Sequence, residues 1–223
     1  MRKSPLRVLL AFTLCAAAFA VSPWPSSPLG GAQEPGAERP ARKSLRELAR
    51  ERDVVVLSHS EVENEYHDVR NLAKAANAIV LGRLTGGGAS FDGDDSIVTT
   101  YQVDVQRVLK DAQEGAPEVR LLPGYKPPAP LQPTIKLVRS GGTVRVNGHT
   151  ASLKADGAKP LPVNADYILF LWWSPSFNAY YLAGGNSGAV LVDADRRVKP
   201  LGAAMSARYN GADVETFISE LLN

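Results

Sequence analysis

The stretch Tyr167–Trp173 (YILFLWW) decides the fold, because it is the most apolar segment of the chain after residue 20. An uninterrupted apolar run of this length, bounded by turn residues, is typical of a strand buried on both faces. We therefore expect residues 167–173 to form the central strand of the core. The next segment, 177–183, is predicted to pair with it across Ser174-Pro175-Ser176.

Two segments before this strand also predict a sheet. Residues 78–84 (AIVLGRL) form a buried strand that Gly86-Gly87-Gly88 is expected to break, and residues 97–109 (IVTTYQVDVQRVL) alternate in polarity along a half-buried strand. Shorter strands are predicted at 118–122, 134–139, 143–146 and 189–192. The segments 134–139 and 143–146 flank Ser140-Gly141-Gly142 as a hairpin. A polar loop is expected after residue 146.

Helical patterns occur only near the two ends. Residues 44–52 predict a short charged helix, and residues 61–76 a longer one that starts with a capping box of Ser60 and Glu63. Residues 212–222 predict a C-terminal helix with an apolar stripe. Since no helical pattern separates the strands, we expect a mainly β (α+β) fold: a small antiparallel β-barrel flanked by an N-terminal and a C-terminal helix.

Five features occur in an order that resembles a group of small bacterial exported domains. They are the alanine-rich helix end with its Gly-Arg strand (75–83), the alternating strand 103–110, Pro123-Gly124, the strand 167–171 and a Gly-rich hairpin at 181–192. The resemblance implies an OB-like or netrin-like (TIMP-like) barrel and no catalytic residues. Netrin-like inhibitors usually depend on cysteines near the mature N-terminus, which this chain lacks, so protease inhibition is not implied.

The N-terminal residues predict export. Basic residues precede an apolar run, Val8–Ala20, which ends in Ala18-Phe19-Ala20, and this is the pattern of a secretory signal peptide over 1–20. The run is shorter than the roughly 20 residues of a membrane span. We expect no stable membrane span after cleavage, and a mature protein in the periplasm or outside a bacterial cell. Residues 21–43 are Pro-rich and predict a disordered linker, which leaves 44–223 as one domain with its barrel at about 77–200.

Charge and cysteine content narrow the function classes. Of the 25 basic residues, Arg2, Lys3 and Arg7 belong to the predicted signal, so 22 remain against 23 acidic residues, a net charge of −1. This balance argues against a nucleic-acid partner. The single cysteine, Cys15, also lies in the signal and follows Leu14, which is too large for lipoprotein processing. The mature chain therefore has no disulfide or thiolate site.

Four aromatic residues are the candidate ligand or partner surface: Trp172, Trp173, Tyr180 and Tyr181. Neighbours on a strand point to opposite faces, so at most one of the two tryptophans lies in the core. The alternative is that these rings only pack the core or lie under a terminal helix. We expect an exported, non-enzymatic module that binds a protein or an envelope component, with no cofactor.

The alternative function is a serine hydrolase. Gly185-Asn186-Ser187-Gly188 is similar to the nucleophile loop of trypsin-like proteases, in which the serine needs a histidine base. The three histidines, His59, His67 and His149, stand outside the sequence contexts of that family, and a Gly-rich hairpin is the competing interpretation.

The acidic turn is a weak candidate for calcium. Asp92, Asp94 and Asp95 surround Gly93, and clustered carboxylates suit a hard cation. The turn lacks the spacing and the later glutamate of an EF-hand, so a solvated acidic turn is the competing interpretation and no metal is assigned.

Overall fold

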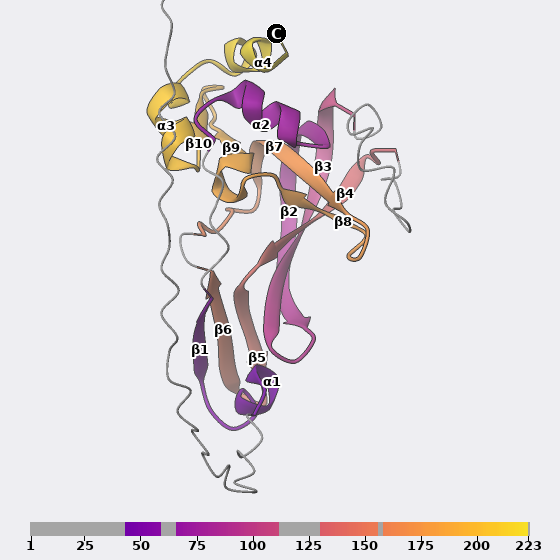
Figure 1. Cartoon of the computed structure of the whole chain (residues 1–223), viewed down its shortest axis with the longest axis vertical. Coiled ribbons are helices and arrows are strands. Elements are labelled where there is room, and N and C mark those ends of the chain that lie inside the picture. The colour runs from indigo at the N-terminus through magenta and orange to yellow at the C-terminus, as the bar shows by residue number, and fades with distance from the viewer. Residues whose placement is uncertain (1–42, 59–65, 112–129, 156–157, 223) are drawn as a thin grey trace, which may run out of the picture. The chain divides into compact units, whose positions relative to one another are not determined.

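The computed structural model of the chain describes residues 43–58, 66–111, 130–155 and 158–222. Within these residues the protein is mainly β, as the sequence predicts (Figure 1). The strands are β1 (Val54–Ser58), β2 (Ala78–Asp92), β3 (Ser96–Lys110), β4 (Thr134–Ser140), β5 (Gly142–Val146), β6 (His149–Ala155), β7 (Ala165–Ser174), β8 (Ala179–Leu182), β9 (Ala189–Val192) and β10 (Val198–Pro200). The helices are α1 (Leu45–Leu48), α2 (Val69–Ala75), the 3₁₀ helix η2 (Gly185–Gly188), α3 (Ala203–Tyr209) and α4 (Val214–Leu222). The predicted signal peptide, all but the last residue of the linker and the predicted strand 118–122 lie outside the described residues.

Five strands form the barrel-like part of the fold. Strand β2 pairs with β3 and β7, and β3 pairs with β4, all antiparallel. Strand β8 pairs with β7 and also meets β4 in a parallel pairing at Leu137 and Tyr180. The ring therefore runs β2-β3-β4-β8-β7 and back to β2, a five-stranded and partly closed barrel. Its closure depends on one register pair between β4 and β8.

Residues 167–171 of strand β7 are buried on both faces, which explains the apolar character of this part of the run. Tyr167, Leu169 and Leu171 point into the barrel interior, where they pack with residues of β2, β3 and β4. Ile168 and Phe170 point to the other face and pack with the helices. The predicted central strand is confirmed, and so is its pairing with the following segment through the β7–β8 hairpin.

The predicted break at Gly86-Gly87-Gly88 is wrong, because β2 continues through the three glycines to Asp92. A side chain at Gly87 would lie 2.8 Å from Cδ1 of Tyr101 on β3, so this glycine makes room for a buried ring. The pairing with β3 also shifts register between Leu84 and Gly86, which is how a long strand bends over a barrel.

The predicted hairpin between 134–139 and 143–146 is also wrong, because β4 and β5 belong to different sheets. Gly141 and Gly142 have φ values of 90° and 143°, and they carry the chain out of the barrel. Strand β5 instead pairs with β6 through Asn147-Gly148, whose positive φ values of 51° and 86° suit a tight hairpin. Strand β6 occupies part of the predicted polar loop.

Strand β1 completes the smaller sheet and was not predicted. It pairs in parallel with β6, from Val54 opposite Ala151 to Ser58 opposite Ala155. It lies at the edge of the sheet, whose order is β1-β6-β5. Val55 and Leu57 on this edge are 62% and 70% exposed.

The predicted helix over 61–76 is shorter in the structure. Helix α2 begins at Val69, because Asp68 has extended backbone angles and its carboxylate accepts the N–H of Arg70 at 2.7 Å. Tyr66 and His67, which precede it, are not helical, and Ser60 and Glu63 lie outside the described residues. Buried residues of α2 pack on the β2–β7 face of the barrel, as expected.

The predicted C-terminal helix is confirmed as α4. Its start is capped by Asp213, whose carboxylate accepts the N–H groups of Glu215 and Thr216. Val214, Phe217 and other residues of the stripe are buried, but Leu222 is exposed. The sequence did not predict the preceding α3 or β10. No helix in the described part of the chain has the length and apolar character needed to cross a membrane.

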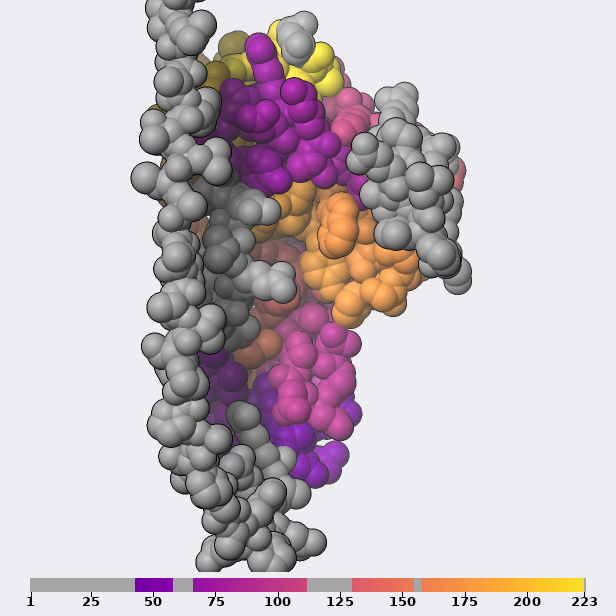
Figure 2. Space-filling model, in the orientation of Figure 1, coloured from indigo at the N-terminus to yellow at the C-terminus, as the bar shows by residue number. Residues whose placement is uncertain are grey.

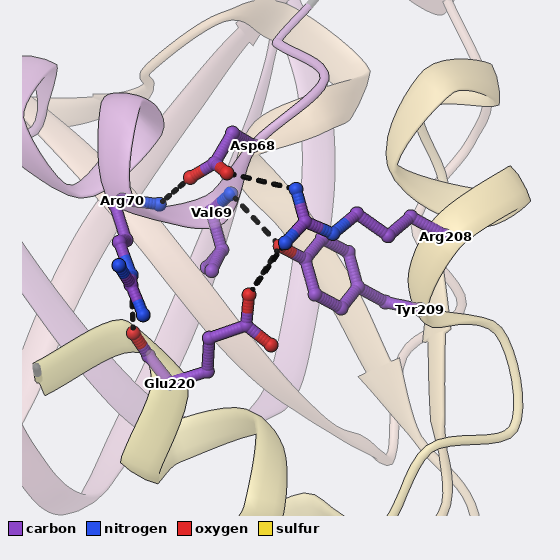
Figure 3. Close-up of polar contacts among 6 residues, drawn as sticks. All are labelled: Asp68, Val69, Arg70, Arg208, Tyr209 and Glu220. Carbon is purple, nitrogen blue, oxygen red and sulfur yellow. Dashed lines mark hydrogen bonds and ion pairs between the residues drawn. The ribbon is translucent and has the colours of Figure 1, made fainter.

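A polar network joins α2, α3 and α4 (Figure 3). The guanidinium of Arg208 donates to Asp68 and to Glu220, each at 2.8 Å. The hydroxyl of Tyr209 donates to the same Glu220 carboxylate and accepts the N–H of Val69. The N–H of Arg70 and then Arg208 hold the pKa of Asp68 below its ordinary value. The network fixes the terminal helices to one another.

Candidate functional site

The four predicted aromatic residues divide between two faces of the β7–β8 hairpin. Trp172 is the register partner of Tyr181, and Trp173 is the register partner of Tyr180. The ring of Trp173 meets that of Tyr180 edge to face at 5.0 Å, on the side of the barrel interior. Trp172 is 54% exposed. One tryptophan therefore packs against the core and the other faces solvent, as strand geometry requires.

Three rings make up what we call the aromatic surface: Trp172, Phe177 and Tyr181. The rings of Phe177 and Tyr181 meet edge to face with centroids 5.6 Å apart. Both rings cover Val98 and Val138, which are buried beneath them. Figure 2 shows the β7–β8 hairpin, in orange, at the molecular surface between α2 and the β2–β3 hairpin.

Electrostatics around Tyr181 are unfavourable for its ionisation. Burial raises the pKa of its phenol, and the negative charge of Asp92 raises it further. Tyr181 is therefore a neutral donor and acceptor at physiological pH. The aromatic surface presents neutral rings with a hydroxyl, a combination suited to contacts that are partly apolar and partly hydrogen-bonded.

The acidic turn holds helix α1 in the structure. A carboxylate oxygen of Asp95 accepts the N–H of Leu45 at 2.8 Å, and Asp94 lies beside Arg46, with 3.5 Å between its carboxylate and Nε. Arg46 also donates its backbone N–H to the Asp94 carbonyl at 2.9 Å. Among the residues that the structure describes, no three His, Cys, Asp or Glu side chains gather in a way that could hold a metal ion.

The Gly-Asn-Ser-Gly loop is not a hairpin, which corrects one interpretation of it. Strands β8 and β9 do not pair with each other. Both pair antiparallel with β7, on the same edge of that strand. The loop forms η2 between them, entered through Gly184 and Gly185 with φ values of 67° and 57°. The chain leaves the barrel ring at this loop and continues toward β10.

The hydroxyl of Ser187 lies inside the protein. Ser187 is 1% exposed, and a side chain built on Gly202 would come within 2.5 Å of its Oγ. In the described part of the chain no histidine is hydrogen-bonded to it: His67 precedes α2, and Nδ1 of His149 lies 4.0 Å from a carboxylate oxygen of Asp53. His59 lies outside the described residues.

Asn186, the neighbour of Ser187, has a structural partner that the sequence did not suggest. Its buried side-chain oxygen accepts from the guanidinium of Arg139 at 3.0 Å and from the N–H of Lys159 at 3.1 Å. Arg139 also donates to the carbonyl of Lys159. The motif therefore anchors the end of β4 and the segment after β6.

Beside these contacts lies a hollow of about 480 Å³, which we call the cationic hollow. It opens where β3 and β4 meet the start of β5 and the end of β6. Its lining includes Arg139, Lys154, Lys159, Thr99, Ser140 and Thr143. Sequence reasoning missed it because these residues come from separate segments, and no spacing pattern connects them before the strand pairing is known.

Comparison with known proteins found no match to the chain among protein-family models, curated proteins or solved structures. The function must therefore be argued from the chain itself.

Proposed function

We propose that the protein is an exported, non-enzymatic module that binds a protein or another component of the bacterial envelope through the aromatic surface. The observation that carries the proposal is the exposure of Trp172 opposite Tyr181, whose ring in turn meets that of Phe177. Burial of an indole ring removes a large apolar area from water, and tryptophan and tyrosine are the residues most enriched where interfaces concentrate their binding energy.

The support beneath the rings favours a binding role. Phe177 and Tyr181 rest on the buried Val98 and Val138, and Trp172 is paired with Tyr181 of β8, one residue after the last pair of β7 with β2. A ring held on a rigid sheet loses little conformational freedom when it binds. A partner would thus meet a surface that already has its bound shape.

The test compares Trp172→Ala with Leu222→Ala, a matched removal of an exposed apolar side chain on α4. The wild-type protein and both variants are immobilised and exposed to detergent-solubilised envelope proteins, and in a second arm they are sedimented with purified peptidoglycan. We expect one component to be retained by the wild type and by Leu222→Ala, and lost with Trp172→Ala. Equal retention by both variants would refute the aromatic surface as the binding site.

A stability measurement separates binding from folding. Trp172→Ala should unfold at nearly the same urea concentration as the wild type, because most of the ring is in water. Trp173→Ala should lose about 2–4 kcal/mol, because its ring packs on Tyr180 and the barrel interior. Loss of the captured component without loss of stability assigns the effect to contact.

The non-enzymatic part of the proposal has its own test, a fluorophosphonate probe on the purified protein. We expect no labelling, because Oγ of Ser187 lies against Gly202. Labelling of the wild type that disappears in Ser187→Ala would replace the binding module with a serine hydrolase.

A further inference from the structure

Strand β1 leaves one edge of the smaller sheet open. The order of that sheet is β1-β6-β5, and in the described part of the chain no strand pairs with the outer edge of β1 (Figure 1). An open edge presents backbone N–H and C=O groups that can pair with another chain, and proteins usually protect it with a charge, a proline or a bulge. The five residues of β1, VVVLS, contain no charge and no proline, and their register with β6 has no bulge.

The side chains of β1 leave apolar surface on both faces of this edge. Val55 and Leu57 point away from α1 and are 62% and 70% exposed. On the other face, Val56 is 37% exposed and lines a hollow of about 380 Å³ together with Leu45 and Leu48 of α1. An added strand would therefore find apolar contacts above and below the plane of the sheet.

We propose that β1 pairs with β1 of a second copy of this chain, antiparallel and centred on Val56, so that two three-stranded sheets join into one of six strands. In this register Val56 faces the partner's Val56, and Val55 lies opposite the partner's Leu57. Val54 lies opposite the partner's Ser58, so all five residues of each strand are paired. A two-fold contact of this kind uses the same patch on both subunits, and strand addition is a recurrent way to bind at a sheet edge.

The symmetry of the register favours a second copy over an unrelated strand. Opposite residues of an antiparallel pair point to the same face, with their Cα atoms about 4.5–5.5 Å apart. Val55 of each copy therefore covers the partner's Leu57, which removes both exposed side chains from water. On the α1 face, the partner's Val56 lies beside Val56 and the hollow that it lines.

Charge does not oppose the contact. After the predicted signal peptide the chain has 22 basic and 23 acidic residues, so two copies repel each other little, and no residue of β1 places a charge opposite its own copy. The contact is short, because five residues of strand extend about 17 Å. It buries less than the roughly 800 Å² per partner of a standard interface, so we expect a reversible dimer that forms as the protein concentration rises.

Single cysteines test the register. Cys15→Ser in the full chain makes each introduced cysteine the only one. Under mild oxidation with oxidised glutathione, Val56→Cys should form a disulfide-linked dimer, because opposite Cα atoms lie within the span of about 4.4–6.8 Å that a disulfide bridges. Val55→Cys should not do so alone, since it lies diagonal to its own copy at roughly 7–8 Å. A mixture of Val55→Cys and Leu57→Cys should form the mixed dimer.

Leu222→Cys on α4 is the matched control, because Leu222 is also an exposed apolar residue. We expect it to remain monomeric under the same oxidation. Equal cross-linking of Val56→Cys and Leu222→Cys would indicate random collision and overturn the proposal. Cross-linking of Val55→Cys alone as efficient as that of Val56→Cys would also overturn it, because the strands would then pair in another register.

Sedimentation equilibrium measures the dimer without a cross-link. The wild type should shift from monomer toward dimer as its concentration rises toward about 1 mM, and Leu57→Lys should weaken this association about tenfold, whereas Leu222→Lys should leave it unchanged. Trp172→Ala should dimerise like the wild type, since the aromatic surface takes no part. A wild type that is monomeric at every concentration, equal weakening by the two lysine variants, or loss of the dimer in Trp172→Ala would overturn the proposal.

Discussion

Replacement of Tyr167 by phenylalanine should change stability in opposite directions at neutral and at alkaline pH. Tyr167 lies in the barrel interior, and its hydroxyl donates to the carbonyl of Pro162 at 3.1 Å. Burial raises the pKa of this phenol from 10.0 to about 12, with a further contribution from Tyr101. The variant loses the hydrogen bond and also loses the ionisable group.

The two effects can be compared in magnitude. At neutral pH the variant loses one partly buried hydrogen bond and should be less stable by about 1 kcal/mol. In the wild type, the folded state holds its proton more tightly than the unfolded state, so stability is complete below pH 10 and is lost as pH rises toward 12. The full loss is about 2.7 kcal/mol. The wild type should therefore be the more stable protein below about pH 10.7, and the variant the more stable one above it.

Urea unfolding of both proteins at several values of pH tests this reasoning, and the absorbance of tyrosinate gives an independent measure of ionisation. Titrating groups that do not interact with Tyr167 are common to the two proteins and cancel in the difference, so Tyr101 is the neighbour whose ionisation is followed beside that of Tyr167. A stability difference that stays constant from neutral to strongly alkaline pH would refute the raised pKa of Tyr167. A variant already more stable at neutral pH would refute the contribution of its hydrogen bond.

Three further changes have clear expected outcomes. Gly87→Ala should cost about 1–3 kcal/mol in urea unfolding, because the new side chain meets Tyr101, whereas Gly88→Ala, with nothing within 4 Å, should cost little. Asp68→Asn should flatten the acid limb of a melting-temperature profile, because the lowered pKa of Asp68 contributes stability that is complete above the ordinary value of 3.8 and is lost as pH falls through the folded value. Leu57→Lys should leave the melting temperature nearly unchanged and reduce light scattering at high protein concentration, because it places a charge on the exposed edge of β1.

The sequence correctly predicted the strands in which apolar side chains alternate regularly or follow one another without interruption. Residues 167–173 became β7 and 97–109 became most of β3, since apolar spacing depends only on which faces are buried. The strands predicted at 134–139 and 143–146 are present as β4 and β5, but their pairing as a hairpin was wrong because local spacing does not determine partners. The Asn147-Gly148 turn was the available signal for the correct hairpin, but β6 has small and polar residues that weaken its pattern.

The candidate sites were predictable to different degrees. Strand alternation alone separated Trp172 from Trp173, because it acts between neighbours in the chain. The contact between Asn186 and Arg139 could not be predicted, since the two residues are 47 positions apart. Only the strand pairing brings them together, and no local sequence pattern indicates that pairing. The Ser187 loop is similar to a nucleophile loop only in its glycines and other small residues. In this fold these residues allow Ser187 to pack tightly against Gly202.

The interruption at η2 has a consequence for how the fold opens. Strands β8 and β9 share one edge of β7. Strand β8 belongs to the β7–β8 hairpin and has a single register pair with β4. Strand β9 pairs with β10, which lies beneath the helices. We therefore expect the two halves to separate from β7 in different fluctuations. Amide protons of β8 should therefore exchange with deuterium through a local opening. Those of β9 should exchange only when the part of the fold that packs against the helices unfolds.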